Sequence, residues 1–228
     1  MIEAEWWDYD SVEEMADAVA GDIGFIVESA LDARGSCLLA LPGGRTPLPI
    51  FRKLAEASLP WKKVTIIPTD DRLVPMQDER SNVRAIAQAF LPTGARVVPI
   101  ATEIPDYKLA GNSADARLQD FPWPPDLAWL GMGEDGHTAS IFAGPDLQDA
   151  LDAPKARRAV GVMPDPMPAD APVPRVTLTR ASILAARTLL ITITGARKRE
   201  LLEGAIADGQ SSKLPIGRGL EPGAVVRG

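Results

Sequence analysis

The chain has 228 residues, enough for one large α/β domain or two small ones, and its 46% hydrophobic and 24% charged residues are ordinary for a globular protein. Its net charge of −7 argues against nucleic acid and anionic membranes as partners, and its one histidine and one cysteine allow no internal disulfide and offer no ligand spacing for a zinc site. Acidic residues crowd the N-terminus and no apolar run reaches about eighteen residues, so we expect a cytoplasmic protein without signal peptide or membrane helix.

The first predicted elements are a long helix and a buried strand. Residues 10–33 carry an apolar stripe at helical spacing, with a capping box of Ser11 and Glu14 at its start and Gly35 after its end. The continuously apolar run 36–41 is typical of a strand in a parallel sheet that is covered on both faces.

A glycine loop follows this strand. Gly43 and Gly44 precede Arg45, and Thr46 with Pro47 is typical of a helix N-cap and first helical position. A helix N-terminus presents free N–H groups and partial positive charge, which suit a phosphate group. The Walker pattern is absent, and for this loop alone an ordinary strand-to-helix turn is the favoured explanation.

A polar segment, Asp70-Asp71-Arg72, follows the second predicted strand at 64–68. Packing explains two carboxylates beside an arginine poorly, although a solvated charged loop is the alternative. Ser81 or Asn82 could cap the helix that comes next, or could reach a ligand. We therefore predict a partly enclosed polar loop at this strand end.

The central feature is a glycine-rich turn at 131–136, after the predicted strand 127–130. The turn delivers Asp135 and His137, the only histidine in the chain. Histidine is well suited to proton transfer near neutral pH, and catalytic groups gather at strand ends in α/β sheets. The turn also matches the dinucleotide pattern G-x-G-x-x-G, but a helix starting there would end within two turns, which disfavours nucleotide binding. From its local sequence alone, a purely structural turn is equally plausible.

The last third of the chain continues the alternation of strands and helices. Strands are predicted at 159–163, 175–179 and 188–194, with a possible last strand at 224–226. The proline-rich excursion 164–174 is expected at the surface. Lys198 falls in the first turn of a helix, where the dipole disfavours a cation, so it either meets an anionic partner or is simply solvated.

Strands that alternate with helices predict an α/β fold with a doubly wound, mostly parallel sheet, here as a single domain over residues 1–228. In such a sheet the loops that follow the strands share one edge. We therefore expect the loop 43–46, the segment 70–72 and the turn 135–137 to converge, with Lys198 as a further candidate.

Five blocks of this sequence resemble, in the right order and over nearly the whole chain, the family of 6-phosphogluconolactonases and glucosamine-6-phosphate deaminases, and the lactonases in particular. The blocks are 41–47, 70–75 with 81–82, 130–142, 175–179, and Gly195 with Lys198. The chain departs from the family pattern at three positions, which usually hold glutamate, serine and proline and here hold Asp71, Arg45 and Ala143. The resemblance implies a Rossmann-related sheet of the NagB/RpiA-like type.

The resemblance also implies an activity, the hydrolysis of 6-phosphoglucono-1,5-lactone to 6-phosphogluconate in the pentose phosphate pathway, without a cofactor or a required metal. His137 would take a proton from water as general base, and Asp135 would orient the imidazole or the water. The oxyanion would be held by Arg72 or by backbone N–H groups of the glycine turn. A covalent route through Ser140 is disfavoured because G-x-S-x-G is absent.

The substrate implied by this resemblance is a small phosphorylated sugar lactone, bound by a monomer or a homodimer. Asp70 would accept hydrogen bonds from sugar hydroxyls. The residues expected to hold the phosphate lie in the glycine loop and at two later cations: Gly43, Gly44, Arg45, Thr46, Arg175 and Lys198.

Two alternatives stay open. A deaminase of the same family would carry a carboxylate five positions after the histidine, where this chain has Phe142. A non-catalytic sugar-phosphate sensor would keep the fold and bind ligand, but the Asp135 and His137 pair argues against it.

Overall fold

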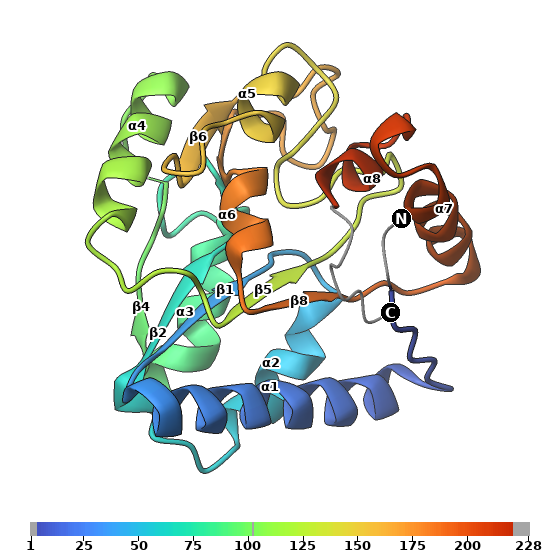
Figure 1. The fold of residues 1–228 in the computed structure, drawn as a ribbon. Coiled ribbons are helices and arrows are strands. Elements are labelled where there is room, and N and C mark those ends of the chain that lie inside the picture. Colours follow the sequence, from blue (N-terminus) through green and yellow to red (C-terminus); the bar gives the residue numbers. More distant parts are fainter. Residues whose placement is uncertain (1–3, 102, 221–228) are drawn as a thin grey trace.

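The computed structural model describes residues 4–101 and 103–220, and its core is a five-stranded parallel sheet (Figure 1). The strand order is β4-β2-β1-β5-β8, and every pair is parallel. The strands are β1 (Cys37–Leu41), β2 (Val64–Pro68), β4 (Arg96–Val97), β5 (Leu127–Leu130) and β8 (Thr188–Ile191). The prediction of a mostly parallel α/β sheet is confirmed, whereas the predicted strand 224–226 lies outside the described residues.

The sheet separates two hydrophobic layers. Alternate residues of β1 take part in opposite cores, with Leu39 and Leu41 on one face and Leu38 and Ala40 on the other. All five residues of β1 are buried, as a strand covered on both faces requires. This burial on both faces explains why the run 36–41 is continuously apolar.

Helices cover both faces of the sheet. The face of Leu39 packs against the helices α1 (Val12–Arg34), α2 (Pro47–Ala55) and α3 (Asn82–Phe90). Helices on the other face are α4 (Tyr107–Leu118), α5 (Leu147–Leu151), α6 (Arg180–Ala185), α7 (Ala196–Asp208) and α8 (Pro215–Gly219). Short 3₁₀ turns cover Trp61–Lys63, Leu91–Thr93 and Gly209–Ser211. Within the described ranges, none of the helices combines the length and apolarity needed to cross a membrane.

The first helix begins and ends as predicted. The Ser11 hydroxyl accepts a hydrogen bond from the Glu14 N–H at 3.0 Å, and the Asp10 N–H donates to the Glu14 carboxylate at 2.9 Å. Gly35 follows the last turn with φ +72°, and its N–H donates to the Leu31 carbonyl. The capping box therefore stabilises this helix by local hydrogen bonds that the sequence alone makes evident.

A second, antiparallel sheet corrects the prediction for residues 70–72. This segment is not a loop but strand β3 (Asp70–Arg72), which pairs with β7 (Arg175–Leu178), and β7 pairs with β6 (Ala159–Val162). Only Thr69 separates β2 from β3, and its N–H and carbonyl bond to Leu41 and Leu178. One residue therefore connects the two sheets, with a backbone hydrogen bond to each.

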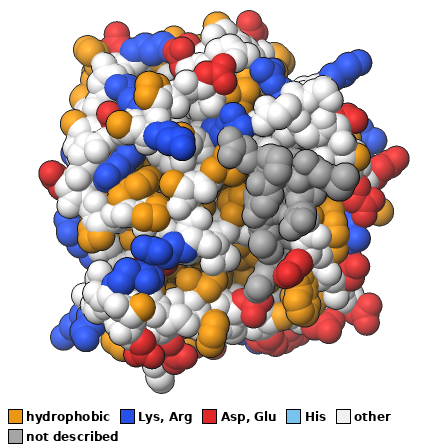
Figure 2. All heavy atoms as spheres, viewed as in Figure 1, with side chains coloured by type: hydrophobic (Ala, Val, Ile, Leu, Met, Phe, Trp, Pro, Cys, Tyr) orange, Lys and Arg blue, Asp and Glu red, His pale blue; other side chains and the backbone are white. Residues whose placement is uncertain are grey.

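Charge is distributed unevenly over the surface. In the view of Figure 2, Lys and Arg side chains gather on the left of the face, while Asp and Glu side chains concentrate along the lower and right-hand edges. The net charge of −7 is thus not a uniform field, so local cationic sites can exist on this chain.

Backbone contact between glycines joins α4 to the small sheet. A Cβ atom on Gly161 would lie 1.7 Å from the Tyr107 carbonyl oxygen, and one on Gly111 would lie 2.0 Å from the Gly161 nitrogen. Real Cβ atoms do not approach backbone this closely. Only glycine at both positions lets α4 pack directly on β6.

We expect Gly161→Ala to lower the free energy of unfolding by about 3 kcal/mol or more, because the methyl group must displace the backbone of α4. Gly204→Ala on α7 is the matched control, since a Cβ atom there meets nothing within 4 Å and alanine favours helix. Urea unfolding of both variants measures the difference, and equal stabilities would contradict the packing described here.

Candidate active site

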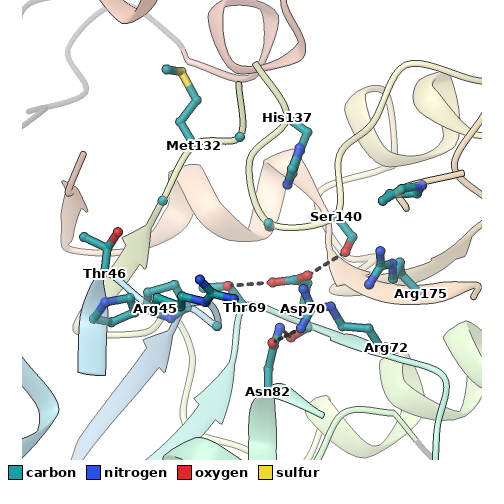
Figure 3. A pocket seen from close by; sticks show the side chains of 18 of the residues that line it. Arg45, Thr46, Thr69, Asp70, Arg72, Asn82, Met132, His137, Ser140 and Arg175 are labelled. Carbon is teal, nitrogen blue, oxygen red and sulfur yellow. Dashed lines mark hydrogen bonds between the residues drawn. The ribbon is translucent and has the colours of Figure 1, made fainter. Parts of the chain in front are cut away.

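A cavity of about 300 Å³ opens at the carboxyl ends of the parallel strands, beside the small sheet. Figure 3 shows Arg72 and Arg175 on one side of it, Arg45 and Thr46 on the other, and His137 at its upper edge. Nine of the ten predicted site residues line this cavity: Gly43, Gly44, Arg45, Thr46, Asp70, Arg72, His137, Arg175 and Lys198. The tenth, Asp135, contacts it through His137.

The histidine is held by two neighbours. Its Nδ1 lies 2.5 Å from Asp135 Oδ1, and its ring stacks on Phe142 with centroids 4.1 Å apart and planes at 22°. The hydrogen bond to His137 lowers the pKa of Asp135, so this carboxyl stays ionised at neutral pH. With Nδ1 engaged, Nε2 is the ring nitrogen left to exchange a proton with a ligand or water.

The glycines of the turn are required by this arrangement. A Cβ atom on Gly133 would lie 2.2 Å from the His137 ring and 2.6 Å from Asp135 Oδ1. Gly136 has φ +77°, a conformation that L side chains rarely adopt. The glycines therefore let the imidazole and its carboxylate lie close to the backbone. A nucleotide-binding loop would not need glycine for this purpose.

Asp70 lies at the floor of the cavity and is 7% exposed. Its Oδ2 accepts a 2.5 Å hydrogen bond from the Ser140 hydroxyl, and its Oδ1 accepts one from Thr69 at 3.3 Å (Figure 3). Ser140 is thus a donor to Asp70, 70 residues away in the chain, and its hydroxyl is directed to this carboxylate and not to His137. This geometry gives Ser140 a structural role and supports the expectation that it is no nucleophile.

Arg72 and Arg175 face each other across the pairing of β3 and β7. Arg175 is only 2% exposed, yet its Nε and Nη1 have no hydrogen-bond partner among the described residues, and the same holds for Arg72 Nε. Burial, and then the charge of Arg72, lower the pKa of Arg175 to about 10, so it remains a cation at neutral pH. Two adjacent guanidinium groups with unused donors have the chemistry that an anion such as phosphate requires.

A buried carboxylate, Asp71, organises this end of the cavity without lining it. Its two oxygens accept hydrogen bonds from the backbone N–H groups of Arg72, Asn82 and Val83 at 2.6 to 3.0 Å, and from the Ser81 hydroxyl at 3.2 Å. Ser81 makes no side-chain cap of its own, so Asp71 caps α3 from another element.

Asn82 then connects three parts of the site. Its amide donates to the Asp70 carbonyl and accepts from Arg72 Nη1, both at 2.8 Å. A Cβ atom on Gly43 would lie 1.8 Å from Asn82 Oδ1, so the glycine loop packs directly on this side chain. The sequence signal for Asn82 was its place at the helix start, but its contacts come from elements far apart in the chain.

The glycine loop supplies the opposite wall. Gly44 has φ +91°, and Arg45 is exposed at the cavity rim. Thr46 precedes Pro47 as predicted, but its side chain makes no cap hydrogen bond. Its hydroxyl is therefore available to a ligand. The expectation of free N–H groups at this helix start is wrong, because Pro47 and Pro49 have no N–H and the Leu48 N–H donates to the Arg45 carbonyl at 3.2 Å.

Lys198 reaches the cavity from the first turn of α7. Its Nζ donates to the Met132 carbonyl at 2.7 Å, which leaves two of its three N–H donors for a ligand. Two further lining residues, Pro168 and Asp170, come from the proline-rich excursion, which the local sequence predicts only as a surface segment. Across residues 4–101 and 103–220, no group of three or more His, Cys, Asp or Glu side chains could hold a metal ion.

Comparison with known proteins identifies the family. Residues 10–225 match the family model described as glucosamine-6-phosphate isomerases/6-phosphogluconolactonase. The chain therefore belongs to the glucosamine-6-phosphate isomerase and 6-phosphogluconolactonase family, as the sequence blocks predicted.

Several similar proteins within this family are lactonases. The 6-phosphogluconolactonase of Rhizobium meliloti is 37% identical over 212 residues, covering 91% of this chain and 90% of that protein. The one from Pseudomonas putida is 34% identical over 216 residues, covering 90% and 87%. A 6-phosphogluconolactonase structure from Shewanella baltica superposes with a TM-score of 0.90 at 27% identity, over 99% of this chain and 96% of that one.

The buried carboxylate generates a prediction about pH. Burial raises the pKa of Asp71 from 3.8 to about 6, so between these values the unfolded chain releases a proton that the folded protein keeps. Its contribution to the free energy of unfolding is therefore present at low pH and falls as the pH rises, by roughly 3 kcal/mol in all. Urea unfolding at pH 4.5 and 7 should show that wild type loses more stability over this interval than Asp71→Asn. Parallel pH dependences would contradict this assignment.

Proposed function

We propose that this protein is a 6-phosphogluconolactonase, which hydrolyses 6-phospho-D-glucono-1,5-lactone to 6-phospho-D-gluconate in the oxidative pentose phosphate pathway. The observation that carries the proposal is a single cavity with a carboxylate-bound histidine at one edge and two guanidinium groups in its wall, each with buried N–H donors that have no partner among the described residues. Hydrolysis of a phosphorylated lactone requires both an activated water and an anion site in the same cavity. The family relatives support the same conclusion.

The phosphate in this proposal binds between Arg72 and Arg175. Both guanidinium groups have buried N–H donors without partners in the described part of the chain, and a phosphate ester supplies strong acceptors in matching geometry. The opposite wall then contacts the phosphate through Arg45, Thr46 and the N–H groups of Gly43 and Gly44, as the sequence suggested. Asp70, held by Ser140 and Thr69, keeps lone pairs for the sugar hydroxyls.

His137 acts as the general base. Its Nε2 removes a proton from water as the water oxygen bonds to the lactone carbonyl carbon, while Asp135 stabilises the imidazolium through Nδ1. When the tetrahedral intermediate collapses, the bond from this carbon to the ring oxygen breaks and His137 returns the proton to that oxygen. The second proton of the water leaves when the new carboxylic acid ionises.

In this scheme, Lys198 stabilises the oxyanion of the tetrahedral intermediate. The N–H groups of Gly133 and Gly136 already bond to carbonyls within the turn, so these two donors of the glycine turn are engaged. Arg72 is committed to the phosphate, whereas Lys198 lies against Met132 of the same turn with two donors unused. A cation beside the developing negative charge stabilises the transition state electrostatically.

The deaminase alternative finds no support at its diagnostic position. Phe142, five residues after the histidine, is 8% exposed and stacks on the His137 ring, where the deaminase would need a carboxylate. An aromatic ring cannot exchange protons, but it holds the imidazole plane and excludes water from one side. The proposal otherwise keeps the expectations from sequence: a single domain, no cofactor or metal, no nucleic acid, a cytoplasmic location, and a monomer or homodimer.

We expect His137→Ala to lower kcat for lactone opening by about 10²- to 10⁴-fold, because the general base is lost while the phosphate site is unchanged. KM should change little. Opening of 6-phosphoglucono-1,5-lactone is measured at neutral pH with spontaneous hydrolysis subtracted. Glu134→Ala, exposed in the same turn and outside the cavity, is the control and should retain wild-type rates. A His137→Ala variant with wild-type kcat would rule out the general-base role.

We expect Arg175→Met to raise KM at least about tenfold without lowering thermal stability. The substitution removes a buried cation whose Nε and Nη1 have no partner among the described residues and whose Nη2 makes one hydrogen bond, to the Ala171 carbonyl. The fold therefore loses little while the phosphate loses a ligand. Steady-state kinetics and thermal melting are measured together, with the exposed Arg52→Met on α2 as control. An unchanged KM would place the phosphate elsewhere.

A further inference from the structure

The proline-rich excursion, residues 164–174, forms part of the cavity wall. It connects β6 to β7, and Pro168 and Asp170 line the cavity. Its end is tied down by two contacts: Arg175 Nη2 donates to the Ala171 carbonyl at 2.9 Å, and the Leu73 N–H donates to the Pro174 carbonyl at 2.9 Å. The excursion is therefore anchored to β7 and to the residue that directly follows β3, next to the guanidinium pair.

Asp170 is the charged side chain of this wall. Its Oδ2 lies 3.8 Å from Arg72 Nη2, too far for a hydrogen bond but close enough for an ion pair. The Asp170 side chain is 75% exposed, whereas that of Arg72 is 21% exposed. The contact is thus a loose, solvated interaction at the rim of a site whose deeper groups are buried.

The charges around the guanidinium pair show what this carboxylate does. Arg72 and Arg175 repel each other, and the negative charges of Asp70, Asp170 and Asp71 offset that repulsion at Arg175. Asp70 and Asp71 are buried and fixed by hydrogen bonds. Asp170 alone of these three is exposed, so it can turn to solvent at little cost.

We propose that Asp170 sets the affinity of this site for phosphate esters, because its carboxylate competes with the ligand phosphate for Arg72. This inference rests on the proposed function in placing the phosphate at the guanidinium pair. Substrate and product carry the same phosphate, so a site without a competitor would hold both more tightly. The competition weakens both by the same factor and favours release of the product.

Asp170→Asn tests the inference by a gain of affinity, which a damaged fold would not produce. An exposed ion pair corresponds to roughly a two- to fivefold change in a dissociation constant. We therefore expect the KM for the lactone, and the inhibition constant of 6-phosphogluconate, to fall two- to fivefold together, with no rise in kcat. Asp170→Ser, which has no carboxylate and a shorter side chain, should shift both constants in the same direction.

Asp165→Asn is the matched control, since Asp165 is an exposed acid of the same excursion that does not line the cavity. It should leave both constants unchanged. Wild-type or raised constants in both Asp170 variants, with thermal melting intact, would overturn the inference, as would an equal gain in Asp165→Asn.

Binding of inorganic phosphate, measured by calorimetry at pH 8, separates this inference from the proposed function. If the protein opened no lactone, the proposed function would fail, but a two- to fivefold tighter phosphate complex in Asp170→Asn would still show the competition. If the lactone is opened and phosphate binds Asp170→Asn no more tightly than wild type, only the role of Asp170 fails.

Discussion

The cavity depends on one buried interaction: the carboxylate of Asp71 accepts hydrogen bonds from four donors. Three backbone N–H groups and one hydroxyl converge on it, so β3 and the start of α3 cannot move independently. That constraint places Asn82, whose amide connects the Asp70 backbone, the Arg72 guanidinium and the glycine loop. A residue that does not line the cavity thereby determines how its ligand groups are arranged. Burial also raises the pKa of this carboxyl, so the arrangement costs stability at neutral pH.

In the proposed mechanism, the chemistry is divided between the two sheets. His137 and its carboxylate follow β5 of the parallel sheet, where a glycine turn lets the backbone bend tightly under the imidazole. Arg72 and Arg175 belong to the antiparallel sheet, where cross-strand pairing puts two guanidinium groups side by side. Proton transfer needs a partly solvated histidine, whereas tight anion recognition benefits from buried donors. Separate sheets provide these different environments within one cavity.

Local signals explain what the sequence could predict. The helix at 10–33, the buried strands and the glycine turns are encoded by periodicity, capping residues and glycine, all within a few neighbours. Asp70-Asp71-Arg72 was expected as a loop because three charged residues show no apolar alternation, yet it is a strand. Its partner β7 lies about a hundred residues later, and that pairing is invisible locally. The bond between Ser140 and Asp70, and the position of Asp170, depend on the same long-range contacts.

The single residue between the sheets has a geometric consequence. Thr69 is fully buried, and its backbone bonds to β1 on one side and to β7 on the other. The distance from the guanidinium pair to the imidazole is thus set by a short, rigid connection and not by a hinge. In the proposed function, the cavity therefore selects compounds by the separation between their anionic group and the carbon that is attacked. Compounds of the right charge but the wrong length would be bound at one end and left out of reach of the histidine at the other.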